Sequence, residues 1–154
     1  GPGSAHIKAV KAGEPLTAVR AAIVNPGRFS AEKLIRFCGQ CHRLPQPGMG
    51  TAPELIEPVV VRMQPIGLLN SRCFRASHKI SCLTCHDPHG NPLPRTSMFY
   101  SRQCLACHAN DPTPIKLCWR KQKQNCLPCH MKQASLTPYL RFTDHRIRVY
   151  SSAP

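Results

Sequence analysis

Acidic residues are scarce in this 154-residue chain, which has 7 Asp and Glu against 21 Lys and Arg and a formal net charge of +14. The basic residues are scattered, without an arginine-rich block or a pattern of stacking aromatics, which argues against nucleic-acid binding. Aromatic residues make up only 6 % of the chain, so side chains alone would build a thin core. No run of 18 apolar residues occurs, which excludes a transmembrane segment.

Cysteine and histidine, in contrast, recur in a fixed order. The pentapeptide Cys-x-x-Cys-His occurs four times. Its cysteines are Cys38, Cys41, Cys82, Cys85, Cys104, Cys107, Cys126 and Cys129, and its histidines are His42, His86, His108 and His130. This pentapeptide is the attachment signature of c-type haem, in which two thiols bond to the porphyrin vinyl groups and the histidine is the proximal iron ligand. The sequence therefore predicts four c-type haems, each with its iron, as cofactors.

Two other cysteine chemistries fit the pattern less well. Structural zinc sites also use Cys-x-x-Cys, but a zinc framework has no reason to place a histidine directly after every pair. A thioredoxin-like redox pair would need one copy in a βαβ context, whereas this chain has four copies. We therefore favour haem over both alternatives.

The amount of protein per cofactor is small, because 154 residues divided by four haems leaves 38.5 residues for each. The haems would form most of the core, with the chain draped around them, and the chain without them would have little stable structure. The 16 prolines and 9 glycines favour loops and short helices. We expect one domain over residues 1–154, mainly α with extensive loops, a haem-dominated core and little or no sheet.

Local signals predict a few elements. Residues 14–23 predict a short helix that stops at the turn signal 25–27. A second helix begins at Ala31, with Ser30 as its N-cap and Glu32 in its first turn, and the first haem would lie at its C-terminal end.

Further along, a proline-rich connector at 44–70 leads into a short helix at 68–74, and residues 59–63 are expected to be extended. The last three proximal histidines are 22 residues apart, which suggests that haems two, three and four are neighbours. The tail from 138 to 154 would be extended and laid over the haems.

Four histidines remain for the sixth iron positions: His6, His78, His89 and His145. Four irons and four spare imidazoles make bis-His coordination of every haem the economical hypothesis. His89 is only three residues beyond His86, so it should reach a neighbouring haem, and Asp144 is expected to orient the ring of His145. Met98 and Met131 are the competing ligands.

The haem motifs also indicate the compartment in which the protein works. Haem is attached to cysteine pairs outside the bacterial cytoplasm, so we expect a periplasmic or extracellular protein whose export signal has been removed. In such an oxidising compartment Cys73 and Cys118 would pair, the alternative being two separate thiols.

Ferric haem carries a charge of −1 with its propionates, so four haems reduce the net charge of the chain from +14 to about +10. Some Arg and Lys would neutralise propionates, and the surplus suggests an acidic redox partner protein.

The motifs and their surroundings resemble a family of multihaem c-type cytochromes, the tetrahaem carriers linked to hydroxylamine oxidation and related domains found beside helical repeats. The resemblance lies in residues 38–43, 67–74, 81–89, 126–131 and 143–147. It implies a mostly helical, loop-rich fold around closely stacked haems. In this family Gly-Pro-Gly-Ser-x-His often follows a haem motif directly. By that resemblance residues 1–6 are native, the alternative being a cloning scar, and His6 is a distal ligand. The chain would then be a fragment, a processed form or the visible part of a longer multihaem protein.

Three functions remain open. The first is an electron carrier with four low-spin haems and no catalytic residue. The second is an enzyme that reduces a small nitrogen or oxygen species at one five-coordinate haem, although no Lys replaces a proximal histidine. The third is a filament in which a histidine near the chain end, such as His6, ligates a haem of the next subunit.

Overall fold

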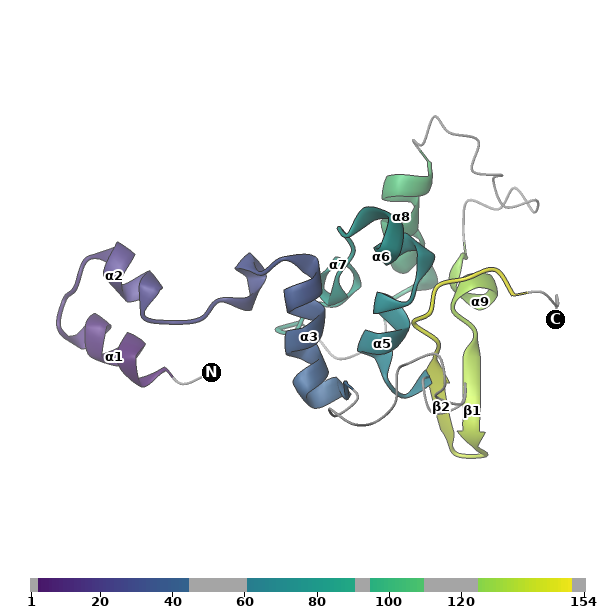
Figure 1. Ribbon diagram of the computed structural model, residues 1–154, viewed down its shortest axis with the longest axis horizontal. Helices are drawn as coiled ribbons and strands as arrows, with labels where there is room; N and C mark the ends of the chain where they lie inside the picture. Colours follow the sequence, from purple (N-terminus) through teal and green to yellow (C-terminus); the bar gives the residue numbers. More distant parts are fainter. Residues whose placement is uncertain (1–2, 45–60, 91–94, 110–124, 151–154) are drawn as a thin grey trace.

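The computed structural model describes residues 3–44, 61–90, 95–109 and 125–150 (Figure 1). The helices are α1 (Ser4–Lys11), α2 (Leu16–Ala21), η1 (Pro26–Arg28, a 3-10 turn), α3 (Ala31–His42), α5 (Gln64–Leu69), α6 (Arg72–Ser77), α7 (Cys82–Cys85), α8 (Ser97–His108) and α9 (Leu127–His130), and the strands are β1 (Gln133–Thr137) and β2 (Leu140–Thr143). Within these ranges the chain is mainly helical with one two-stranded sheet. The predicted class, mainly α with little sheet, is confirmed, and the haem-dominated core stays a prediction.

Helix α3 forms where the sequence predicts it. The Ser30 hydroxyl caps the helix by accepting a hydrogen bond from the Lys33 backbone N–H at 3.3 Å. Glu32 lies in the first turn and forms an exposed ion pair with Arg36 at 2.8 Å. The helix ends at His42, so its last turn carries the first haem motif.

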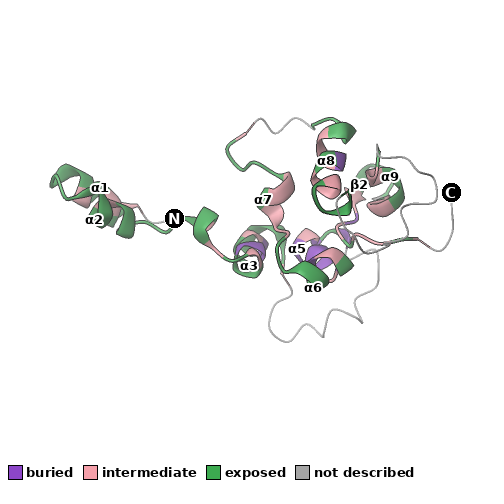
Figure 2. Ribbon diagram, turned by 90° about the horizontal axis from the view of Figure 1, so that it is seen from above, coloured by how far each residue is buried: buried purple, intermediate pink, exposed green. Residues whose placement is uncertain are grey.

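The apolar core is small and lies among helices α3, α5 and α6. Ile35 of α3, Leu68 of α5 and Phe74 of α6 form its centre, where α3 contacts α5 (Figure 2). Among the described residues all seven buried apolar side chains lie between positions 34 and 74. Helices α7, α8 and α9 bury no apolar side chain at all. Within the described residues, the part of the chain that carries the last three motifs therefore has no hydrophobic core of its own.

The expected helix at 68–74 is instead two helices. Helix α5 ends at Leu69, and α6 begins at Arg72. The fully buried Ser71 separates them, because its hydroxyl accepts from the Phe74 backbone N–H at 3.1 Å and so starts a new helix. Val61, expected to be extended, lies in a helical turn, whereas positions 59 and 60 fall outside the described residues.

The tail is extended at β2, which pairs with β1 in an antiparallel hairpin in which Gln133 faces Thr143. After β2 the chain turns back, and the Arg148 N–H donates to the His130 carbonyl at 3.2 Å. The same segment lies against α5 at Gly67, where an added Cβ would be 2.9 Å from the Arg146 nitrogen. Residues 144–150 thus run between α5 and α9, and positions 151–154 fall outside the described residues.

Helices α1 and α2 contact each other and form an arm that lies apart from the remaining helices in both views (Figures 1 and 2). The helix expected at 14–23 is shorter, and the predicted stop is confirmed because Asn25 accepts a hydrogen bond from the Gly27 N–H at 3.0 Å. The arm exposes large apolar side chains, including Leu16 and Val24.

Candidate haem-attachment sites

Each haem motif lies at the C-terminal end of a helix. Helices α3, α8 and α9 end on the proximal residues His42, His108 and His130, and His86 directly follows α7. Positions three apart on a helix are surface neighbours, so the two cysteines of each motif lie on one side of the helical turn. The four motifs therefore present the same local arrangement, two adjacent thiols followed at once by an imidazole.

The four motif helices contact one another in the order of the sequence. Helix α3 contacts α7, α7 contacts α8, and α8 contacts α9. The 22-residue spacing predicts that motifs two, three and four are neighbours, and the contacts agree with that prediction. They also bring the first motif to the second, although 44 residues separate His42 from His86.

The first cysteines of motifs one and two lie near each other, and so do those of motifs three and four. Burial, followed by the nearby Cys38 thiol, raises the pKa of Cys82 to about 12. Burial, followed by the nearby Cys126 thiol, raises the pKa of Cys104 to about 12. Thiols with such pKa values stay protonated at neutral pH, so Cys82 and Cys104 are not activated as thiolate nucleophiles.

In three histidines a hydrogen bond fixes which ring nitrogen carries the proton. The Nδ1 atoms of His6, His130 and His145 lie 2.9, 3.1 and 2.9 Å from the carbonyls of Val19, Arg148 and Thr143, respectively. A carbonyl oxygen only accepts, so each Nδ1 carries the proton, and the Nε2 lone pair remains for a metal. Such a bond to the second ring nitrogen is typical of histidines that ligate metals.

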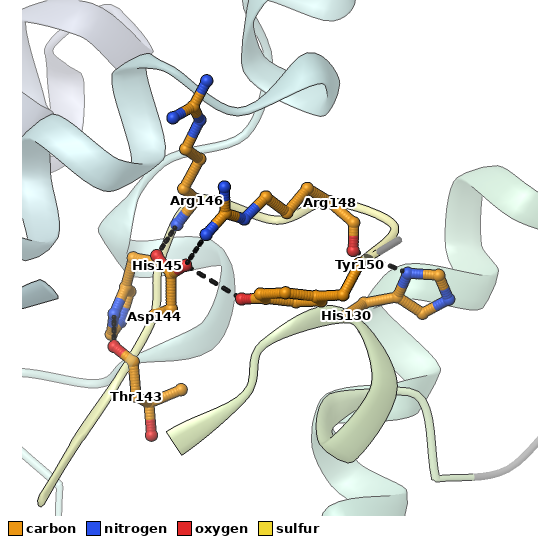
Figure 3. Close-up of polar contacts among 7 residues, drawn as sticks. All are labelled: His130, Thr143, Asp144, His145, Arg146, Arg148 and Tyr150. Carbon is orange, nitrogen blue, oxygen red and sulfur yellow. Dashed lines mark hydrogen bonds and ion pairs between the residues drawn. The ribbon is translucent and has the colours of Figure 1, made fainter. Parts of the chain in front are cut away.

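The carboxylate of Asp144 does not orient the His145 ring, contrary to the sequence-based expectation. It accepts instead from the Arg146 N–H at 2.8 Å and from the Tyr150 hydroxyl at 2.8 Å, and it lies 3.5 Å from the Arg148 guanidinium (Figure 3). The buried Asp144 therefore fixes the backbone of its segment, and the Thr143 carbonyl orients the ring. Asp144 does not bind the adjacent His145 ring, because its carboxylate already interacts with these three donors.

The proximal ligand of the second motif lies close to this segment. The rings of His86 and His145 are 6.2 Å apart between centroids and inclined by 28°. Burial, followed by repulsion from His42, lowers the pKa of His86. Burial lowers the pKa of His145, against the opposing hydrogen bond to Thr143.

The other predicted distal ligands are more dispersed. His6 lies on α1, in the arm that is apart from the motif helices (Figure 1). His78 ends α6 in the left-handed region at φ 52°, with its ring 5.2 Å from that of Phe74. His89 is exposed in the turn after α7. None of these three is brought to a particular motif by a contact in the described residues.

The remaining sequence-based predictions are the competing iron ligands Met98 and Met131 and the disulfide between Cys73 and Cys118. Met98 lies on α8 and is 37 % exposed, and Met131 directly follows α9. Cys118 lies outside the described residues, so its pairing with Cys73 stays a prediction. Cys73 is half-buried, and burial raises the pKa of its thiol.

An open hollow of about 230 Å³ lies against the first motif. Its lining includes Cys41 and His42 together with the two basic residues Arg43 and Arg62. Guanidinium groups bind carboxylates well, so this hollow offers the neutralising cations that haem propionates need.

The donor side chains for a bare metal ion are dispersed in the described part of the chain. Within the ranges described, no group of three or more His, Cys, Asp or Glu side chains is placed to hold a metal ion. A structural zinc site needs four such donors at one point, whereas haem iron takes only its axial ligands from the protein.

Ser101 is a positioning residue that sequence reasoning missed. It is fully buried on α8, and its hydroxyl accepts from the backbone N–H groups of Asn125 and Cys126, both at 3.1 Å. Ser97 bonds to the Asn125 side chain at 2.6 Å. These bonds tie the third motif helix to the first residue of the fourth motif across 25 residues.

Replacing Ser101 tests this connection. Ser101→Ala leaves two backbone donors without an acceptor, so we expect the free energy of unfolding to fall by about 1–2 kcal/mol. Ser4→Ala, an exposed serine on α1, is the matched control and should cost no more than about 0.5 kcal/mol. Denaturant unfolding of the haem-loaded variants measures both, and equal effects would contradict the assignment.

Comparisons with protein-family models, with curated proteins and with solved structures found no match. None of the helices in the described residues is long and apolar enough to cross a membrane. The function is therefore inferred from the residues of this chain.

Proposed function

We propose that this protein transfers electrons through four c-type haems attached at its four Cys-x-x-Cys-His motifs. The observation that carries this proposal is the contact of the motif helices in sequence order, α3 to α7, α7 to α8 and α8 to α9. Cofactors tethered to helices that touch would be near neighbours, which favours electron transfer from one centre to the next.

The residues of the chain have distinct roles in this proposal. Bound haem supplies a one-electron iron couple that no side chain offers. The paired cysteines fix each ring to its helix, and the motif histidine binds the iron. The Arg148 carbonyl holds the Nδ1 proton of His130, so its Nε2 faces outward as a ligand. A second imidazole on each iron would close it to substrates, which suits a carrier rather than an enzyme.

Charge and export give the setting of the proposed function. The net charge of +14 exceeds what four haems would neutralise, so an acidic redox partner protein is the expected donor or acceptor. Covalent haem attachment takes place on exported chains, and we propose a periplasmic or extracellular location accordingly.

A second candidate function, assembly into a filament, is favoured by one observation. His6 has its Nδ1 fixed by the Val19 carbonyl and lies on the arm formed by α1 and α2, apart from the four motifs of its own chain (Figure 1). With its Nδ1 held in this way, His6 has its Nε2 available to bind the haem iron of another copy of the chain. Sedimentation in dilute solution separates the candidates, because a carrier stays small whereas a filament grows with concentration.

Haem content tests the main proposal directly. The purified protein should be red, and its pyridine haemochrome spectrum should give four c-type haems per chain. Intact mass should exceed that of the bare polypeptide by four haem groups, because thioether links survive denaturation. A colourless protein with the polypeptide mass would reject the proposal, and a zinc content of one or more per chain would favour the structural alternative.

A further inference from the structure

We infer that His86 and His145 are the two axial ligands of one iron, that of the haem attached at Cys82 and Cys85. The inference rests on the proposed haem function and adds to it the pairing of a distal ligand with a particular haem. Three independent features of the described residues support it: the separation of the two rings, the state of the His145 ring, and the rigidity of the segment that carries it.

The separation of the rings matches axial ligation. An imidazole nitrogen binds a metal at about 2.0–2.1 Å and lies roughly 1.1 Å from its ring centre, so two imidazoles on opposite sides of one iron have centroids about 6.3 Å apart. The centroids of His86 and His145 are 6.2 Å apart. Both ring planes can contain the common iron–nitrogen axis at any mutual angle, so the observed 28° is compatible with this geometry.

The state of the His145 ring leaves the correct nitrogen available. Its Nδ1 lies 2.9 Å from the Thr143 carbonyl and therefore carries the proton (Figure 3). The Nε2 atom keeps its lone pair, and the hydrogen bond at the far nitrogen makes it a stronger ligand.

The segment around His145 is held from both sides. Asp144 is 5 % exposed and accepts from the Arg146 N–H and the Tyr150 hydroxyl, which fixes the backbone beside the ring. On the other side Gly67 lets α5 approach, since an added Cβ would lie 3.0 Å from the His145 carbonyl carbon. Contacts of this kind fix the orientation of a ligand in the folded protein.

Neighbouring histidines do not offer the same geometry. Within the described residues the ring contact of His145 is with His86, not with His42. Tyr100 also faces His86, at 6.3 Å between centroids, but a phenol on the side of a helix is a weaker candidate than a neutral imidazole for a haem that already has one histidine. The pairing is therefore assigned to the second motif rather than to the first.

The test uses the haem-loaded protein and its His145→Ala variant. We expect one additional high-spin ferric haem per chain in the electron paramagnetic resonance spectrum and one additional equivalent of carbon monoxide bound after reduction. Added imidazole should return the spectrum to that of the parent. Arg146→Ala, an exposed neighbour whose backbone N–H remains, is the matched control and should leave the spin state unchanged.

A variant that lacks the second haem shows which iron His145 binds. In a Cys82→Ser, Cys85→Ser variant, which lacks the second haem, His145→Ala should add no high-spin signal. A new signal there would assign His145 to another haem, and an unchanged low-spin spectrum in the single variant would reject ligation by His145. If His145→Ala fails to accumulate, His145→Met should keep all haems low spin and raise the potential of one, and no shift would overturn the pairing. A haem count of zero in the parent would instead reject the proposed function itself.

Discussion

The chain made without haem is expected to show no cooperative thermal unfolding transition. Its seven buried apolar side chains all lie between positions 34 and 74 of the described residues, and α7, α8 and α9 bury none. Helices of four residues, such as α7 and α9, are far too short to be stable in water by themselves. The motif half of the chain therefore depends on the cofactors for its interior.

Circular dichroism of a chain with all eight motif cysteines replaced by serine measures this effect. The haem-loaded parent at the same concentration is the control, and it should retain helical signal and melt in a single step. A cooperative transition in the haem-free chain would show that the polypeptide folds without its cofactors, and the idea of a haem-built interior would then be wrong.

We expect the second large effect, a loss of stability, when Ile35 is replaced by alanine. Its side chain is fully buried against Leu68 and Phe74, where α3 meets α5 and α6. Ile35→Ala removes apolar contacts and leaves a cavity, which typically lowers the free energy of unfolding by about 2–5 kcal/mol. Because this cluster holds the helix of the first motif in place, the variant should also bind haem less completely at Cys38 and Cys41.

Guanidinium unfolding followed by circular dichroism gives the stability, and intact mass gives the haem content. Ile7→Ala is the matched control, since Ile7 is 54 % exposed on α1 and should cost no more than about 0.5 kcal/mol. Equal losses in the two variants would mean that the cluster around Ile35 is not the structural centre.

Local signals predicted the parts of the fold that depend on neighbouring residues. Ser30 caps α3 as expected, and the turn at Asn25 stops the preceding segment. Both features arise from a side chain that bonds to a backbone group two or three residues away, so a single stretch of sequence contains all partners. The four motifs are visible for the same reason, because each needs only five consecutive residues.

The parts that sequence reasoning missed depend on distant partners. Ser101 is an ordinary serine in the sequence, and only the fold brings it to the Asn125 and Cys126 backbone. Asp144 looked like the orienting group for His145, yet Tyr150 and its other donors hold it elsewhere. Helix α8 was not predicted either, although Thr96 is its N-cap and accepts from the Phe99 N–H at 3.3 Å. That cap was the signal available in advance.

The unequal lengths of the motif helices have an electrical consequence. Helices α3 and α8 have 12 residues each, whereas α7 and α9 have four. A long helix carries a macrodipole whose negative end lies at its C-terminus, and a cation there is stabilised by about 0.3–1 kcal/mol. An iron held at the end of α3 or α8 would favour the ferric state by that amount, which lowers its midpoint potential by roughly 10–40 mV. Alternating long and short helices would thus impose an alternating driving force along the proposed haem series.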